Sequence, residues 1–150
     1  MKLVILDSET VSKGDVSLDE ITSLCDSSVY GYTPNELVAE RIGDADAVLC
    51  NKCLITKDVF DRCPNLKFVG LFATGYNNVD LHAAKDIMTI VRVPEYSPHA
   101  VAEHTLALLL TLVRKTHKAY IRTRDYNFSL AGMTGFDLNG KTVGVIGTGK

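Results

Sequence analysis

Two glycine-bearing turns are the clearest places where this sequence could bind a ligand. Thr74-Gly75 follows an apolar run at 66–73, and Gly147-Thr148-Gly149 follows a second run at 142–146. Glycine carries no Cβ, so the main-chain amides of such a turn can point at an anion. A Gly-x-Gly between a strand and a helix is the setting in which a dinucleotide pyrophosphate binds. The first turn predicts an anion site, with a plain tight turn as the alternative, and the second predicts a nucleotide site.

The cysteines give a weaker pattern. Cys50 and Cys53 form a C-x-x-C sequence, but redox chemistry of this type needs its first cysteine near a helix N-terminus. Here Cys50 ends an expected strand, and the next helix is expected only near Thr56. Cys63 could add a third metal ligand, yet no histidine is close to it in sequence. We therefore predict neither a metal site nor a redox site.

Short strands and helices alternate along the first two thirds of the chain. Strands are expected at 2–6, 29–32, 47–50, 66–73 and 89–93, with helices at about 17–25, 34–42, 56–62 and 78–86. Capping boxes at Ser17 and Thr33 would begin two of these helices, with Pro34 in a first helical position and Gly43 after the end. Such alternation predicts an α/β fold, a flavodoxin-like, doubly wound parallel sheet with helices on both faces.

A different organisation follows this sheet. Ser97-Pro98 opens a long apolar helix that we expect to be buried, with His104 as a packed structural residue. Cations in its last turns, from Arg114 to Lys118, suit the helix dipole. Residues 123–140 are expected to connect this helix to a buried strand at 142–146, the first of a Rossmann domain. The predicted division is one domain at 1–97, then the linking helix and the beginning of a nucleotide domain at 98–150.

The sheet determines where its ligand site should lie. In open α/β sheets, ligands bind beyond the carboxyl ends of the strands. Those ends are Asp7, Asn51-Lys52, Thr74-Gly75 and the segment 94–96. Asn51 and Lys52 could contact a ligand there, although Lys52 could equally be a solvated lysine. A phosphate-receiving signalling domain is disfavoured, because the positions for its aspartate and lysine hold Asn51 and Arg92.

Composition excludes several classes of partner. The net charge is −2, 46% of residues are hydrophobic, and no basic block is present, so we expect neither a nucleic-acid nor a membrane partner. The first apolar run is too short for a signal peptide. Four cysteines without such a signal indicate free thiols in a reducing compartment, and hence a cytoplasmic protein.

Three stretches resemble the D-isomer-specific 2-hydroxyacid dehydrogenase family. They are the segments 72–80 (FATGYNNVD), 93–104 (VPEYSPHAVAEH) and 140–150 (GKTVGVIGTGK). Residues 127–130 and 134–136 are similar to the D-lactate dehydrogenase branch, whereas Asn51-Lys52 and 73–75 are closer to the glycerate dehydrogenase branch. The resemblance implies an NAD-dependent oxidoreductase that interconverts a small 2-keto acid and a D-2-hydroxy acid.

The resemblance also implies roles for individual residues. The amides of Thr74 and Gly75 would hold the substrate carboxylate, and Tyr96 would face the substrate, unless it is an ordinary half-buried tyrosine. Cofactor contacts would come from the pairs Val101 and Thr105, near the nicotinamide, and Gly147 and Gly149, at the pyrophosphate, with helix packing as the alternative for the first pair. No catalytic residue is expected in this chain, because the family's Arg, Glu and His lie further along.

Expectations for the isolated chain follow from the same resemblance. We expect a homodimer formed through the region of the long helix, because the family usually pairs there. We expect no turnover from the 150 residues alone, which would lack the proton relay and most of the NAD site. A non-catalytic flavodoxin-like module that only binds or associates is the alternative function.

Overall fold

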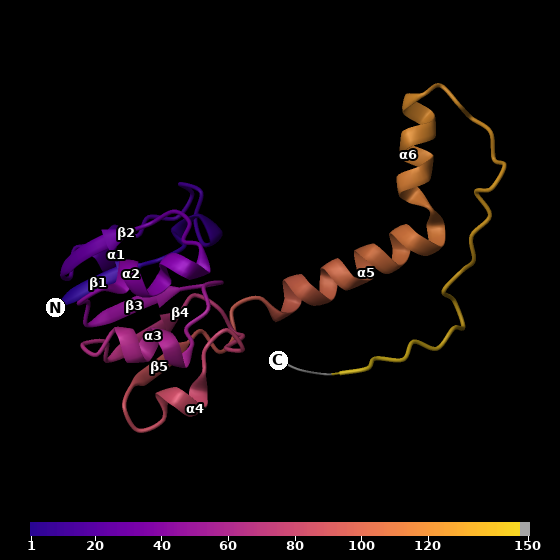
Figure 1. Ribbon diagram of the computed structural model, residues 1–150. Coiled ribbons are helices and arrows are strands. Elements are labelled where there is room, and N and C mark those ends of the chain that lie inside the picture. The colour runs from indigo at the N-terminus through magenta and orange to yellow at the C-terminus, as the bar shows by residue number, and fades with distance from the viewer. Residues whose placement is uncertain (148–150) are drawn as a thin grey trace. The chain divides into compact units, whose positions relative to one another are not determined.

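A computed structural model describes residues 1–147, and its first part is built around one parallel sheet. The strands are β1 (Lys2–Ile5), β2 (Asp26–Val29), β3 (Ala47–Cys50), β4 (Phe68–Leu71) and β5 (Thr89–Arg92). They are all parallel and lie in the order β2-β1-β3-β4-β5 (Figure 1). This is the flavodoxin-like order, which confirms the predicted α/β parallel sheet.

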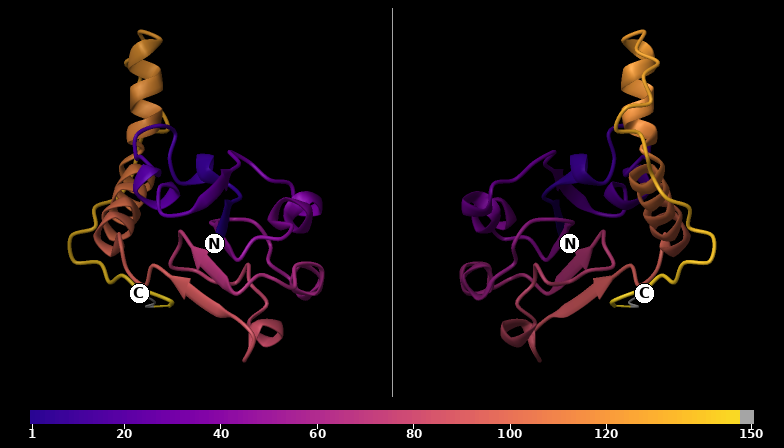
Figure 2. Two further views of the ribbon diagram at one scale, coloured as in Figure 1. Left: turned by 90° about the vertical axis from the view of Figure 1, so that its left-hand side faces the viewer. Right: turned by 90° about the vertical axis from the view of Figure 1, so that its right-hand side faces the viewer.

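Helices lie on both faces of this sheet. They are η1 (Ser8–Thr10), α1 (Asp19–Thr22), η2 (Asn35–Leu37), α2 (Val38–Ile42), α3 (Lys57–Arg62) and α4 (Leu81–Ala84). The helices α2, α3 and α4 cover one face, and α1 lies against the other (Figure 2). Parallel strands need such cover because both of their faces are apolar.

The side chains of successive strand residues pack into two separate apolar clusters, because they point alternately to the two faces of the sheet. Val4, Val48 and Val69 point into the larger cluster, which includes Val38 and Ile42 of α2. The smaller cluster is on the opposite face and consists of Leu3, Ile5 and Ala47 with flanking residues such as Ile21, Leu49 and Phe68. These two layers fix the sheet, and with it the strand ends.

The second strand was placed wrongly from sequence. It occupies Asp26–Val29 rather than 29–32, and its register pairs Lys2 with Asp26 and Ile5 with Val29. Three of its four residues are exposed, because β2 is an edge strand. Polar residues are tolerated at such an edge, so the strand lacks the apolar signal on which the expectation depended.

Both predicted capping boxes were also wrong. The Thr33 hydroxyl donates to the Leu6 carbonyl at 2.5 Å instead of capping a helix, and Pro34 is extended and precedes the 3₁₀ turn η2. The Ser17 hydroxyl accepts the Asp19 N–H at 3.0 Å, but Leu18 is the N-cap residue of α1. The predicted stop at Gly43 is confirmed, with a φ of +53° that favours glycine.

The fourth helix is much shorter than the predicted 78–86. It covers only Leu81–Ala84 and is capped by the Asp80 carboxylate, which accepts the Ala83 N–H at 3.0 Å. Residues 78–80 instead run beside the loop after β3, where Val79 forms a parallel bridge with Ile55. The apolar pattern of Val79 therefore reflects burial against that loop rather than a helical face.

The chain divides into two compact units, Met1–Pro94 and Glu95–Lys150. The second contains α5 (Pro98–Arg114) and α6 (Thr116–Arg124). The expectation of one continuous helix was wrong, because Lys115 has a φ of +55° in the left-handed region and separates the two. The prediction that this helix is buried was also wrong, because Val113 is the one buried residue of α5 and His104 is exposed.

The expected strand at 142–146 is not formed. Residues 141–146 are exposed and belong to no strand, because no described strand pairs with them and a strand needs a hydrogen-bonded neighbour. Gly147 follows with a φ of +88°, whereas Gly149 lies outside the described residues. No helix within residues 1–147 is long and apolar enough to cross a membrane.

Candidate functional site

The strand ends that were expected to form a site meet at one edge of the sheet. The register pairs Cys50 of β3 with Leu71 of β4, and Leu71 with Arg92 of β5. The Phe72 N–H also donates to the Cys50 carbonyl at 2.9 Å. The loops that begin at Asn51 and Phe72 therefore leave the sheet side by side, as the strand-end rule predicts.

Asp7 is a site residue whose role the sequence did not reveal. It follows β1 and is only 2% exposed. Its carboxylate accepts the main-chain N–H groups of Asn51 at 2.8 Å, Lys52 at 2.6 Å and Cys53 at 3.3 Å. A buried carboxylate needs such donors, and three amides on one carboxylate fix a short stretch of main chain. The available signal was a single acidic residue directly after an apolar strand.

Asn51 and Lys52 take up different positions in this loop. The Asn51 side-chain amide donates to the Thr10 hydroxyl at 3.0 Å, so it joins the loop to η1. Lys52 is exposed and lines a cavity of about 200 Å³ with Asp7, Thr10 and four further residues, Tyr32, Thr33, Asn35 and Cys53. Lys52 therefore supplies a cation at the edge of the site, whereas Asn51 is held by the protein itself.

The Thr74-Gly75 turn is fixed from β5. The Arg92 guanidinium donates to the Thr74 carbonyl at 2.8 Å, and the Val93 N–H donates to the Ala73 carbonyl at 3.1 Å. Gly75 is exposed, its φ lies outside the left-handed region, and a Cβ added to it would meet only the Asn77 Oδ1 at 3.4 Å. The fold itself does not require glycine here, and the space beside its main chain is open.

Asn78 connects the loop after β4 to the loop after β3. Its side-chain amide donates to the Cys53 carbonyl at 2.9 Å, and its own carbonyl accepts the Ile55 N–H at 2.8 Å. The Asp80 N–H then donates to the Ile55 carbonyl at 2.9 Å. The loops that follow β1, β3 and β4 are thus one hydrogen-bonded surface.

The remaining predicted residues lie in the second unit. Tyr96 is 68% exposed, and Val101 is 66% exposed on α5. The Thr105 hydroxyl donates to the Val101 carbonyl at 2.8 Å, within the same helix. Gly147 is exposed, with no atom within 4 Å of an added Cβ. Residues 141–146 therefore do not form the strand that would precede a dinucleotide-binding turn.

Burial makes the C-x-x-C thiols poor nucleophiles. Cys50 and Cys53 are both free and buried. Burial, followed by the nearby negative charge of Asp7, raises the pKa of Cys50 far above its ordinary range and that of Cys53 to about 12. The reactive form of cysteine is the thiolate, which such pKa values suppress at neutral pH. Among the described residues, no cluster of His, Cys, Asp or Glu could hold a metal ion.

A larger cavity of about 670 Å³ lies elsewhere in the first unit. Its lining is mostly apolar and includes Leu3, Leu49 and Phe68, together with Met1, Asp46 and Lys67 from the amino ends of the strands. A ligand site needs a few converging polar groups that fix orientation. We therefore place the candidate site at the carboxyl ends of the neighbouring strands β3, β4 and β5, where Lys52, the Thr74-Gly75 turn and Arg92 lie.

Comparison with known proteins identifies the family. The catalytic-domain pattern of the D-isomer specific 2-hydroxyacid dehydrogenases matches residues 5–143. A D-lactate dehydrogenase of Escherichia coli K12 is 58% identical over 86 residues, which is 57% of this chain and 26% of that enzyme. A 2-hydroxyacid dehydrogenase homolog of Haemophilus influenzae is 40% identical over 158 aligned residues, covering 100% of this chain and 46% of that protein.

A solved structure agrees with this assignment. The apo-structure of D-lactate dehydrogenase from Escherichia coli has a TM-score of 0.75 and 37% sequence identity, covering 100% of this chain and 50% of that one. The chain thus spans about half the length, or less, of the relatives that it matches. Because the family pattern covers residues 5–143, this chain belongs to the D-isomer-specific 2-hydroxyacid dehydrogenase family.

Proposed function

We propose that the whole protein is an NAD-dependent oxidoreductase that interconverts a small 2-keto acid and a D-2-hydroxy acid. The observation that carries this proposal is the Thr74-Gly75 turn, in which Arg92 holds the Thr74 carbonyl at the carboxyl edge of the sheet and Gly75 is exposed. Membership of the dehydrogenase family supplies the reaction class. A carboxylate is the group that the amides of such a turn suit best.

The substrate carboxylate is proposed to bind the amides of Thr74 and Gly75. Lys52 adds a positive charge at the same edge. Asn51, whose side-chain amide donates to the Thr10 hydroxyl, is proposed as a further substrate contact. Tyr96 is proposed as a residue that faces the substrate, as the family resemblance implies. Carbonyl binding and proton transfer are assigned to Arg, Glu and His residues of the whole protein outside these 150, as the family resemblance implies.

NAD is proposed as the cofactor of the whole protein, in which it would accept or deliver the hydride. The support is the Gly147-x-Gly149 sequence, while Val101 and Thr105 remain proposed nicotinamide neighbours. Because residues 141–146 form no strand in this structure, we propose that the 150-residue chain alone binds NAD poorly and does not turn over. We also propose a cytoplasmic location, as the thiols suggest.

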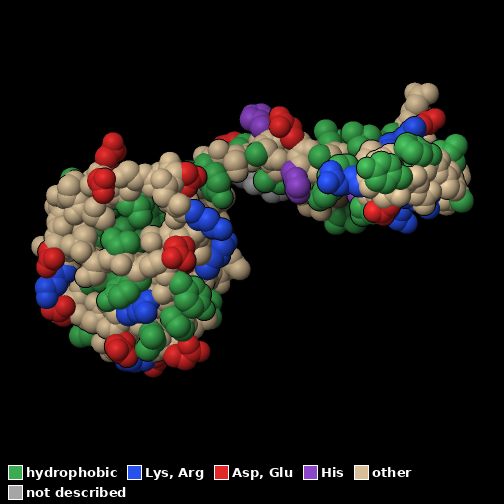
Figure 3. Space-filling model, turned by 90° about the horizontal axis from the view of Figure 1, so that it is seen from above, with side chains coloured by type: hydrophobic (Ala, Val, Ile, Leu, Met, Phe, Trp, Pro, Cys, Tyr) green, Lys and Arg blue, Asp and Glu red, His purple; other side chains and the backbone are tan. Residues whose placement is uncertain are grey.

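A homodimer is proposed from the surface of the second unit. Hydrophobic side chains lie at that surface (Figure 3), and along α5 the exposed ones are Val101, Leu106, Leu108, Leu110 and Leu112, each at least 48% exposed. Apolar patches of this kind mark association surfaces. Because of the same surface, we propose that the isolated chain behaves as a non-catalytic module that associates with other chains. Light scattering should report dimers, and a monomer at high concentration would refute this part.

The substrate assignment is tested by removing the carboxylate from the ligand. The intact protein is assayed with NADH and pyruvate, and in parallel with acetone, which keeps the ketone and replaces the carboxylate by a methyl group. Turnover of pyruvate with little or no turnover of acetone supports a carboxylate-binding site. Equal turnover of both ketones, or no turnover of any small 2-keto acid, would contradict the proposal.

A further inference from the structure

We propose that Asp7 is a positioning residue that sets the main-chain geometry of residues 51–53 and thereby the position of Lys52 at the site. It would touch neither substrate nor cofactor and would act only through the loop. The functional half of this inference rests on the proposed role of Lys52, whereas the structural half stands on contacts within the first unit. The two halves call for separate measurements.

The contacts divide between the two carboxylate oxygens. Oδ1 accepts the Asn51 N–H at 2.8 Å, while Oδ2 accepts the Lys52 N–H at 2.6 Å and the Cys53 N–H at 3.3 Å. Hydrogen bonds from amides to an ionised carboxylate are about twice as strong as those between neutral groups. Three consecutive amides directed at one buried charge leave residues 51–53 little freedom.

Thr10 strengthens the same connection. Its hydroxyl donates to the Asp7 carbonyl at 2.8 Å and accepts the Asn51 side-chain amide at 3.0 Å. The end of β1 is thereby joined to the loop after β3 through both the side chain and the main chain of Asp7. The hydrogen bonds that reach residues 51–53 cross 41 to 46 positions of the sequence, so they are tertiary contacts rather than features of a local turn.

This arrangement assigns different tasks to the two loops. The amides of residues 51–53 are occupied by Asp7, so they are not available to a substrate anion. The loop offers the ammonium group of Lys52 instead, which lines the same cavity as Asp7. A displaced main chain would move this cation relative to the Thr74-Gly75 turn and weaken substrate binding before it affected the chemical step.

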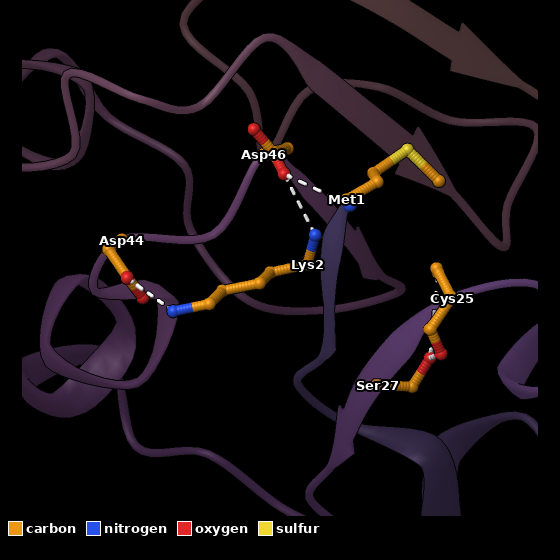
Figure 4. A network of polar contacts seen from close by, with 6 residues as sticks. All are labelled: Met1, Lys2, Cys25, Ser27, Asp44 and Asp46. Carbon is orange, nitrogen blue, oxygen red and sulfur yellow. Dashed lines mark hydrogen bonds and ion pairs between the residues drawn. The ribbon is translucent and has the colours of Figure 1, made fainter.

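The structural half is tested by amide hydrogen exchange in the intact protein. The Lys52 N–H should be protected although it lies in an exposed loop, and D7N should speed its exchange by about 10- to 100-fold, as loss of a charge-assisted bond would. The control is D46N, because Asp46 accepts the Lys2 N–H at 2.8 Å at the other end of β1 (Figure 4). Exchange of the wild-type Lys52 amide at the rate of an unprotected loop amide would overturn the proposal, even if D7N failed to fold.

The functional half is tested by steady-state kinetics of the same variants. D7N should raise the KM for the 2-keto acid by about 10-fold, with kcat changed less than twofold, because binding depends on the position of Lys52. D46N should leave both constants unchanged, and V48A serves as a core variant that lowers stability without removing a hydrogen bond to Asp7. A fall in kcat at constant KM, or an equal effect of V48A, would contradict a positioning role.

A double variant separates this inference from the proposed substrate site. If Lys52 mediates the effect, D7N should raise KM much less in a K52M background than in the wild type. A K52M variant with wild-type KM would refute the proposed Lys52 contact, while the exchange result for D7N would still test the connection between Asp7 and the loop. Full additivity of D7N and K52M would refute the route through Lys52.

Discussion

The guanidinium of Arg92 donates a hydrogen bond of 2.8 Å to the main-chain carbonyl of Thr74. This bond joins the end of β5 to the loop after β4. The same guanidinium lies 5.4 Å from the centroid of the Tyr76 ring. One side chain therefore holds the residues on both sides of Gly75. The proposed carboxylate amides owe their placement to this arginine rather than to a special glycine conformation.

Replacing Arg92 should weaken substrate binding. R92A removes the bond to Thr74 and the contact with Tyr76, which together are worth about 1–2 kcal/mol. We expect the KM for the 2-keto acid in the intact protein to rise about 10-fold, with a small change in thermal stability. The matched control is R62A, an exposed arginine that pairs with Asp58 on α3. Equal kinetics for R92A and R62A would argue against this role.

A side chain at position 75 should obstruct the substrate without harming the fold. The added Cβ has an ordinary contact with Asn77 and no backbone strain to overcome. We expect G75V to raise KM by at least 10-fold, consistent with about 1.4 kcal/mol or more of lost binding, and G75A to fall between it and the wild type. Steady-state kinetics and thermal melting check both points. An unchanged KM for G75V would remove the carboxylate role of this turn.

The charge of Lys52 should contribute to substrate binding in a salt-dependent way. K52M removes the cation and keeps the length of the side chain, so we expect a several-fold higher KM at low ionic strength and a smaller difference at high salt. Lys57 is a suitable comparison, because it pairs with Asp61 on the surface of α3. If K57M raised KM as much as K52M, the effect would be one of overall charge and not of this site.

The sequence was sufficient to predict the sheet and the edge at which the site lies. Four of the five strands coincide with apolar runs, and the alternation of these runs with helical patterns indicated a parallel sheet. The position of the Thr74-Gly75 turn, at the carboxyl end of a strand, could be predicted from that sheet. The strand β2 was missed because Asp26, Ser27 and Ser28 carry no apolar pattern at an edge. Periodicity reports burial, and an edge strand is not buried.

Other features depend on contacts that a linear pattern does not contain. The three amides that meet Asp7 lie 44 to 46 positions away, and nothing in the local sequence predicts them. Thr33 satisfied the rule for a helix cap, but the Leu6 carbonyl is its actual partner. The apolar residues of α5 were expected to be buried, yet apolar composition does not specify which surface covers a helix.

The buried thiols should resist alkylation. Burial raises the pKa of Cys53 to about 12, so at pH 8 only about one molecule in ten thousand carries its thiolate. We expect a maleimide or disulfide reagent to label Cys25, which is partly exposed, long before Cys50 or Cys53 in the folded protein. All four cysteines should react in denaturant. Rapid labelling of Cys53 in the native state, located by peptide mass spectrometry, would contradict its burial.

We propose that this chain forms the substrate side of a D-2-hydroxyacid dehydrogenase. The most direct test incubates the intact protein with NADH and pyruvate, follows the loss of NADH absorbance, and determines the configuration of the product by chiral chromatography. We expect NADH oxidation with D-lactate as the product, and the same handedness with other small 2-keto acids that turn over. No NADH oxidation with any small 2-keto acid, or formation of the L-isomer, would contradict it.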